Sequence, residues 1–173
     1  MNLLLSVWSF VGACFLTFDK PFNLTSNGYF AAWTVVFGSA MANGLTAGMA
    51  GGHLKGMGAI NGLLVSSLVV VLASIRPVAD NAANYNEALY AMVLSCVTFV
   101  IFGMLVFMDN RGKEMLTAKP YFGMLGIFTI FWIVMACFVT FRGPFDVTGN
   151  GYFGSWIGAA TCAFATFAAK ADI

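Results

Sequence analysis

The side chains of this chain that could do chemistry are few, and none of those inside its long apolar stretches carries a charge. The clearest polar groups there are amides and hydroxyls, at Asn43, Asn61, Ser66, Ser67, Ser95, Thr98, Thr129 and Thr161. Enzymes that work within a membrane need titratable groups or cofactor ligands there, so catalysis fits this set poorly. Neutral donors and acceptors suit hydrogen bonding between helices, or the passage of a small neutral solute. Asn43 and Asn61 are the candidate pore-lining residues for the second task.

Cysteine and histidine do not add a reactive centre. The four cysteines lie inside apolar stretches, where they are typical of small packing residues, at Cys14, Cys96, Cys137 and Cys162. His53 follows two glycines and has no second His or Cys nearby, whereas metal sites draw on several ligands. The sequence therefore predicts a protein that is not an enzyme, with no metal, no cofactor and no nucleic-acid partner.

The composition is that of an integral membrane protein. Of 173 residues, 60% are hydrophobic and 9% are charged, whereas a soluble domain carries about 25% charged residues. A spanning helix needs roughly 20 apolar residues, and runs close to that length fall at 3–18, 29–48, 57–75, 88–108, 121–141 and 152–169. The sequence predicts an all-α fold of six transmembrane helices, arranged as three hairpins. Because the connections are short, we expect residues 1–173 to form a single membrane domain in the lipid bilayer.

The distribution of basic residues predicts the orientation of the chain in the membrane. All eight lysines and arginines fall in connections or at helix ends. With six spans, one side of the membrane holds Lys55, Arg111, Lys113, Lys119 and Lys170, and the other holds Lys20, Arg76 and Arg142. Cytoplasmic connections carry the excess of basic residues. We therefore expect both termini on the cytoplasmic side.

A segment of twenty residues occurs twice, 123 residues apart. Residues 14–33 and 137–156 agree at twelve positions, which are Cys14/Cys137, Phe15/Phe138, Thr17/Thr140, Phe18/Phe141, Pro21/Pro144, Phe22/Phe145, Thr25/Thr148, Asn27/Asn150, Gly28/Gly151, Tyr29/Tyr152, Phe30/Phe153 and Trp33/Trp156. Chance would give about one or two agreements. Both copies would enter the membrane from the same side, so the hairpins at 1–50 and 121–169 form a parallel internal repeat. Whether the middle hairpin, 57–108, is a degraded third copy stays open.

Each copy contains a corner motif that has the elements of a helix stop and restart. A proline prevents the first helix from continuing, a Thr and an Asn offer oxygens to the unpaired amides of the next helix, and a Gly permits a tight approach or a positive φ. A Phe in the corner folds back under the headgroups or onto a neighbouring corner. A Tyr and a Trp four residues apart are typical of anchors in the aromatic belt at the membrane surface. These residues are Pro21, Phe22, Thr25, Asn27, Gly28, Tyr29 and Trp33 in the first copy, and Pro144, Phe145, Thr148, Asn150, Gly151, Tyr152 and Trp156 in the second.

Glycines four residues apart indicate faces on which helix backbones approach closely. They are Gly44 and Gly48, Gly58 and Gly62, and Gly154 and Gly158. The spacing does not say whether the partner helix belongs to the same chain. Together with the duplicated corner, these faces favour a structural or assembly protein that packs laterally into a homo-oligomer or against other membrane subunits. The alternative function is a passive channel or facilitator for a small neutral solute.

Overall fold

The computed structural model describes residues 2–19, 21–22, 25–49, 56–113 and 117–170, and within these ranges the chain is helical and contains no strand. The elements are α1 (Asn2–Cys14), a π-helical turn η1 (Phe15–Asp19), α2 (Asn27–Met49), α3 (Met57–Ala79), α4 (Tyr85–Asp109), α5 (Ala118–Phe141) and α6 (Asn150–Lys170). The all-α prediction is therefore confirmed for the described residues.

Three helices of the described chain are both long enough and apolar enough to cross a membrane, namely α3, α4 and α5. The first hairpin adds a shorter apolar stretch at Leu4–Phe18. Helices α2 and α6 have sufficient length, at 23 and 21 residues, but they are less apolar. Three helices of this kind are compatible with an integral membrane location.

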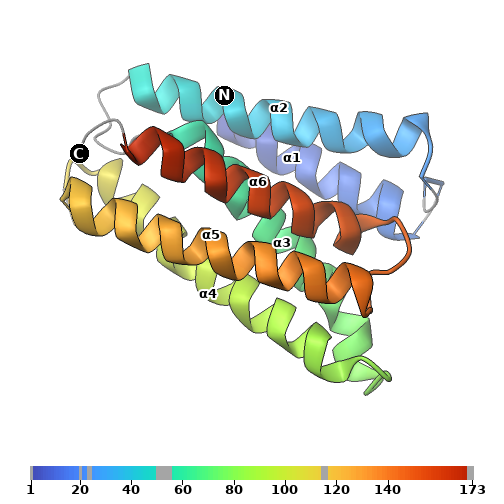
Figure 1. Cartoon of the computed structure of the whole chain (residues 1–173). Coiled ribbons are helices and arrows are strands. Elements are labelled where there is room, and N and C mark those ends of the chain that lie inside the picture. The colour runs from blue at the N-terminus through green and yellow to red at the C-terminus, as the bar shows by residue number, and fades with distance from the viewer. Residues whose placement is uncertain (1, 20, 23–24, 50–55, 114–116, 171–173) are drawn as a thin grey trace.

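Helix α3 lies at the centre of the arrangement, with α2, α4 and α6 packed along it (Figure 1). Helix α6 is held between α3 and α5, whereas α4 and α5 contact each other less closely. Helix α1 lies at the edge of the bundle and packs on α2. Four helices, α3 to α6, therefore form the main bundle, and the first hairpin packs against its α3 side.

Two apolar clusters correspond to these two parts. The main core joins α3, α4, α5 and α6, and its largest member is Trp132, which is fully buried. The Trp132 indole N–H donates to the Thr98 hydroxyl at 3.1 Å, so the one polar atom of this side chain is paired. The second cluster joins the first hairpin to α3 through Ala13, Tyr29, Trp33, Val36 and Val69.

Buried hydroxyls in the bundle are mostly used within their own helices. Each donates to the carbonyl oxygen four residues earlier, in the pairs Ser67 to Leu63, Ser74 to Val70, Thr98 to Leu94, Thr140 to Ala136 and Ser155 to Gly151. Such bonds satisfy a hydroxyl where water is absent. A hydroxyl bonded in this way does not present its proton to a passing solute.

Three of the predicted packing glycines hold helices of this chain together. A Cβ on Gly62 would lie 2.9 Å from the Thr161 methyl group, and one on Gly154 would lie 3.0 Å from Val69. A Cβ on Gly158 would run into the Trp132 ring. These glycines therefore seat α6 against α3 and α5. Gly58 lies in the first turn of α3, and the surroundings of Gly44 and Gly48 lie outside the described residues.

We predict that Gly158→Leu destabilises the folded chain by about 1–3 kcal/mol or more, because the added side chain must displace the buried Trp132 ring. Gly123→Leu is the matched control, since Gly123 is an exposed helical glycine whose Cβ would meet no atom within 4 Å. Thermal unfolding in detergent measures both. Equal unfolding temperatures for the two variants would contradict the packing role of Gly158.

Candidate functional site where the two corners meet

The first corner is closed by one backbone hydrogen bond and one ring contact. The Phe22 N–H donates to the Leu16 carbonyl oxygen at 2.8 Å, which turns the chain back beneath the end of η1. The Phe22 ring then lies on Gly28, where an added Cβ would approach the ring to 2.5 Å. Gly28 is therefore required for this close approach. Its φ is not positive, so the predicted alternative of a left-handed turn does not apply.

The second corner uses the same two contacts at the equivalent positions. The Phe145 N–H donates to the Val139 carbonyl oxygen at 2.7 Å. The Phe145 ring lies on Gly151, where an added Cβ would again approach the ring to 2.5 Å. The fold-back of Phe22 and Phe145 predicted from the sequence is thus directed onto a glycine of the same corner.

Helix capping differs from the prediction. In the first corner the Ser26 hydroxyl accepts the Tyr29 N–H at 3.4 Å, and Gly149 stands at the equivalent position of the second corner, so the copies do not share this cap. Thr25 and Thr148 are exposed. The side chain of Asn27 lies outside the described residues.

The prediction that Asn150 caps α6 is wrong, because its side chain reaches the other hairpin. The Asn150 Oδ1 accepts the Trp33 indole N–H at 3.0 Å, and its Nδ2 donates to the Thr17 hydroxyl oxygen at 3.2 Å. The Thr17 hydroxyl in turn donates to the Ala13 carbonyl oxygen at 2.7 Å. Asn150 therefore ties the second corner to both segments of the first hairpin.

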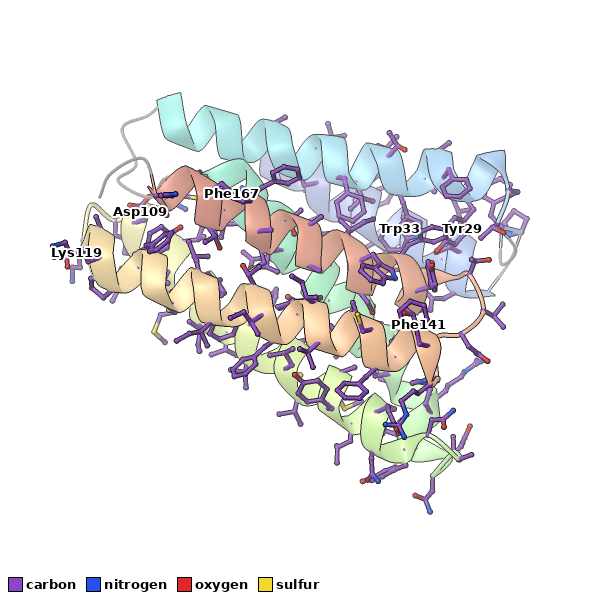
Figure 2. The ribbon with its side chains drawn as sticks, in the orientation of Figure 1. Tyr29, Trp33, Asp109, Lys119, Phe141 and Phe167 are labelled. Carbon is purple, nitrogen blue, oxygen red and sulfur yellow. The ribbon has the colours of Figure 1, made fainter. Side chains whose placement is uncertain are left out.

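Aromatic rings from the two copies also meet. Phe30 and Phe153 occupy equivalent positions, and their ring centroids lie 5.4 Å apart in an edge-to-face arrangement. The Tyr29 ring lies 6.0 Å from the same Phe153 ring. Figure 2 shows Tyr29 and Trp33 between α2 and α6, toward the end of the bundle where the corners lie. The two corners thus converge on one site.

The aromatic-belt prediction is wrong for the first copy. Tyr29 is 2% exposed and Trp33 is 7% exposed, so both are enclosed by protein. Tyr152 and Trp156 are half-buried, and the Trp156 ring packs edge-on against Phe141. The spacing of Tyr29 and Trp33 did not predict their burial, because residues four apart share one face of a helix whether that face contacts lipid or protein.

Two buried polar atoms of the corner motifs donate no hydrogen bond within the described residues, the Tyr29 hydroxyl and the Trp156 indole nitrogen. The Tyr29 oxygen has the Trp33 indole N–H as its hydrogen-bonding neighbour. The neighbouring Trp33 cannot accept its proton, because an indole offers only an N–H donor, and that donor already serves Asn150. A buried donor without an acceptor is unfavourable.

A cavity of about 380 Å³ lies between α2 and α6 with Tyr29 in its lining, and we name it the corner cavity. Its α3 contribution is Val69, which forms the floor between the two helices. Among the described residues, the lining contains rings, aliphatic side chains and a few neutral polar groups and no carboxylate, amine, imidazole or thiol: Tyr29, Phe30, Trp33, Thr34, Phe37, Gly38, Val69, Asn150, Phe153, Gly154 and Ile157. Such a lining can bind an apolar molecule and orient it, but it supplies no acid or base pair.

Of the two candidate pore residues, Asn61 does not line this cavity. Asn61 is half-buried on α3, and the Asn43 side chain lies outside the described residues. Among the described residues, no group of three or more His, Cys, Asp or Glu side chains could hold a metal ion.

Comparisons of the chain with protein-family models, with curated proteins and with solved structures find no match.

We predict that Asn150→Ala costs roughly 1–3 kcal/mol, because the Trp33 N–H loses its acceptor within a buried cluster. Thr148→Ala is the control, since Thr148 belongs to the same corner but is exposed. In the Asn150→Ala background, Trp33→Phe should add less than it costs alone, because the hydrogen bond is already absent. Unfolding measurements on the four variants test this. Strictly additive costs would mean that the two side chains are not coupled.

Proposed function

We propose that this chain is a structural or assembly protein of the membrane, with six transmembrane helices, that packs laterally into a homo-oligomer or a larger membrane complex. In this proposal the first and last hairpins are a parallel internal repeat. The observation that carries it is how the described chain uses its polar groups. Most of the buried ones are bonded within helices or between the two corners, and apolar helix faces are the main surface offered to a partner.

The neighbours of α2 and α6 support six spans. Helix α6 packs along α3 and α5, and α2 packs along α3. Both α3 and α5 have the length and apolarity of a membrane span. A helix that runs beside such spans over its whole length shares their depth in the bilayer (Figure 1). The lower apolarity of α6 is then explained by its glycines, which face α3 and α5 and do not face lipid.

The outer faces of the helices support lateral packing. Large apolar side chains point outward along the described helices, and among the most exposed are Leu4, Trp8, Phe15, Val100, Phe141, Phe164 and Phe167. Faces of this kind suit contact with acyl chains and with other transmembrane helices. Close packing inside the chain already uses Gly62, Gly154 and Gly158, so we expect contacts between chains to run through these larger side chains.

The centre of the bundle weighs against a pore within one chain. Trp132, Phe102 and Leu125 are fully buried there and fill the space between the helices. Most of the buried hydroxyls of the bundle, such as those of Ser67 and Thr98, are bonded to their own helices, whereas the buried Ser66 and Ser95 hydroxyls have no partner within the described residues. A pathway for a neutral solute needs a continuous row of available donors and acceptors. We therefore rank the channel function below the structural one.

The six-span proposal predicts a topology with both termini on the cytoplasmic side. Cysteines introduced in place of Lys113 and Lys170 should react with a membrane-impermeant maleimide only from the cytoplasmic face. Cysteines in place of Arg142 and Asp146 should react only from the opposite face. The unmodified chain is the control, because its own four thiols lie in or beside apolar helices. Labelling of positions 113 and 142 from the same face would exclude this topology.

Assembly is tested by the mass of the particle and by transport in the same preparation. Purified protein in a mild detergent should have a mass several times that of the 18.5 kDa chain, and it should pass no urea or glycerol when placed in liposomes. A monomer under all mild conditions would contradict the structural proposal. Solute flux that Asn61→Leu abolishes, with the oligomer intact, would instead support the channel.

A further inference from the structure

We propose that a groove between α1 and α3 binds one anionic phospholipid, with the lipid phosphate on the Arg76 guanidinium and one acyl chain along the apolar walls. The lipid belongs to the leaflet on the side of the two corners. This inference rests on the six-span arrangement of the proposed function, and it does not depend on whether the chain forms an oligomer. The groove and the corner cavity share no described lining residue.

The groove exists because α1 and α3 do not pack closely on each other. Both helices pack on α2, and the contacts between α1 and α3 themselves are few at most. The space between them has a volume of about 510 Å³, which lies within the range of sites that hold small ligands. Its described lining consists of apolar side chains, one thiol and one arginine: Phe10, Val11, Cys14, Phe15, Phe18, Leu72 and Arg76.

The charge lies at the end of the groove that is near the membrane surface. Arg76 belongs to the last turn of α3, which ends on the side of the corners. From Phe18 back to Phe10 the lining extends eight residues toward the middle of the membrane, which is about 12 Å at the rise of an α-helix. A hydrocarbon core is about 30 Å thick. The groove therefore has the depth of one leaflet, with its charged group at the level of the headgroups.

Arg76 supplies a positive charge that the described chain does not neutralise. Its side chain is exposed, and no carboxylate of the described residues forms an ion pair with it. A guanidinium presents its N–H donors in a planar fork that matches a phosphate group and binds it through two parallel hydrogen bonds. A phospholipid places its phosphate among the headgroups and its acyl chains in the hydrocarbon. One lipid molecule thus matches both the charge and the apolar walls.

A transmembrane helix of a second copy is the competing occupant. A spanning helix of about 20 residues is about 30 Å long, so the groove would contact it over less than half of its length. Hydroxyl and carbonyl groups of such a helix would not neutralise a guanidinium, and the helix would have to place a carboxylate at the level of Arg76. An anionic lipid supplies its negative charge at that level in every orientation around the protein. Depth and charge together therefore favour the lipid.

The second copy of the repeated segment provides a matched control. Cys137, Phe138 and Phe141 occupy the positions of the groove residues 14, 15 and 18, and the Arg142 guanidinium lies 5.9 Å from the centroid of the Phe138 ring. Arg142 is exposed and lies on the same side of the membrane as Arg76 in the six-span arrangement. It does not line the groove.

Two pairs of variants separate the charge from the walls. Arg76→Gln and Arg142→Gln each remove one positive charge on the side of the corners, so their effects on net charge are equal. Val11→Trp fills the groove from α1. Val7→Trp makes the same change one turn earlier, at an exposed residue of α1 that does not line the groove.

The measurement is the rise in unfolding temperature when lipid is added to delipidated protein in detergent, since a ligand that binds only the folded state stabilises it. Phosphatidylglycerol, which is anionic, is compared with zwitterionic phosphatidylcholine of the same acyl chains. The unmodified protein should show the larger rise with phosphatidylglycerol, and Arg142→Gln and Val7→Trp should keep this difference. Arg76→Gln and Val11→Trp should lose most of it.

The proposal is overturned if Arg76→Gln keeps the difference between the two lipids, or if Arg142→Gln loses as much of it as Arg76→Gln does. A Val11→Trp chain that keeps the difference would also overturn it. Should Val11→Trp fail to fold, the two arginine variants decide alone.

Particle mass is recorded for each variant, so that the lipid site and the assembly function are tested separately. A Val11→Trp chain that loses its oligomer but keeps the lipid difference would place a second copy in the groove and overturn the proposal. A monomeric unmodified protein whose preference for phosphatidylglycerol is abolished by Arg76→Gln alone would count against the assembly function while supporting the lipid site.

Discussion

The two hydrogen bonds of the Asn150 amide are the interaction on which the relation between the first hairpin and the last depends. Helices α2 and α6 share little direct packing, although both lie on α3. Asn150 crosses this gap to the Trp33 indole and the Thr17 hydroxyl. Within an apolar environment a satisfied amide of this kind fixes one arrangement, because moving it would leave several buried polar atoms unpaired. The convergence of the corners and the shape of the cavity beside them both follow from this tie.

A second constraint is the close packing of α6 against α3 and α5. Gly62, Gly154 and Gly158 remove side-chain volume where α6 meets α3 and α5, and the Trp132 ring occupies the space that Gly158 leaves. Where α6 faces α2 the chain has no comparable fit, and the corner cavity results. The placement of small and large residues around α6 thus explains both its close contact with α3 and α5 and the open space between α6 and α2.

Hydrophobic runs predicted most of the helices but not their ends. The predicted span 88–108 corresponds to α4 at Tyr85–Asp109, and 57–75 corresponds to α3 at Met57–Ala79. The structure extends both, because a helix continues through polar residues such as Arg76 and Asp109, where an apolar window has already ended. Hydropathy reports the environment of side chains, whereas the end of a helix is decided by backbone hydrogen bonds.

The roles of residues at the site were harder to predict, for a physical reason. Asn150 and Trp33 are 117 positions apart, so nothing local distinguishes an Asn that caps its own helix from one that reaches another. Tyr29 and Trp33 carry the spacing of surface anchors and are buried instead. Only the contacts within a corner, such as Phe22 on Gly28, lay within the reach of local sequence.

The hydrogen bonds of Asn150 also restrict which substitutions the two similar segments can accept. Asn150 acts on Trp33 and Thr17, which belong to the other copy, whereas Trp156 packs on Phe141 of its own copy. The copies are therefore not interchangeable, although their sequences remain alike. Positions 17, 33 and 150 should covary over evolutionary time as one group, while position 156 should follow position 141. Segment 137–156 therefore supplies the anchoring Asn150 side chain, and segment 14–33 receives it.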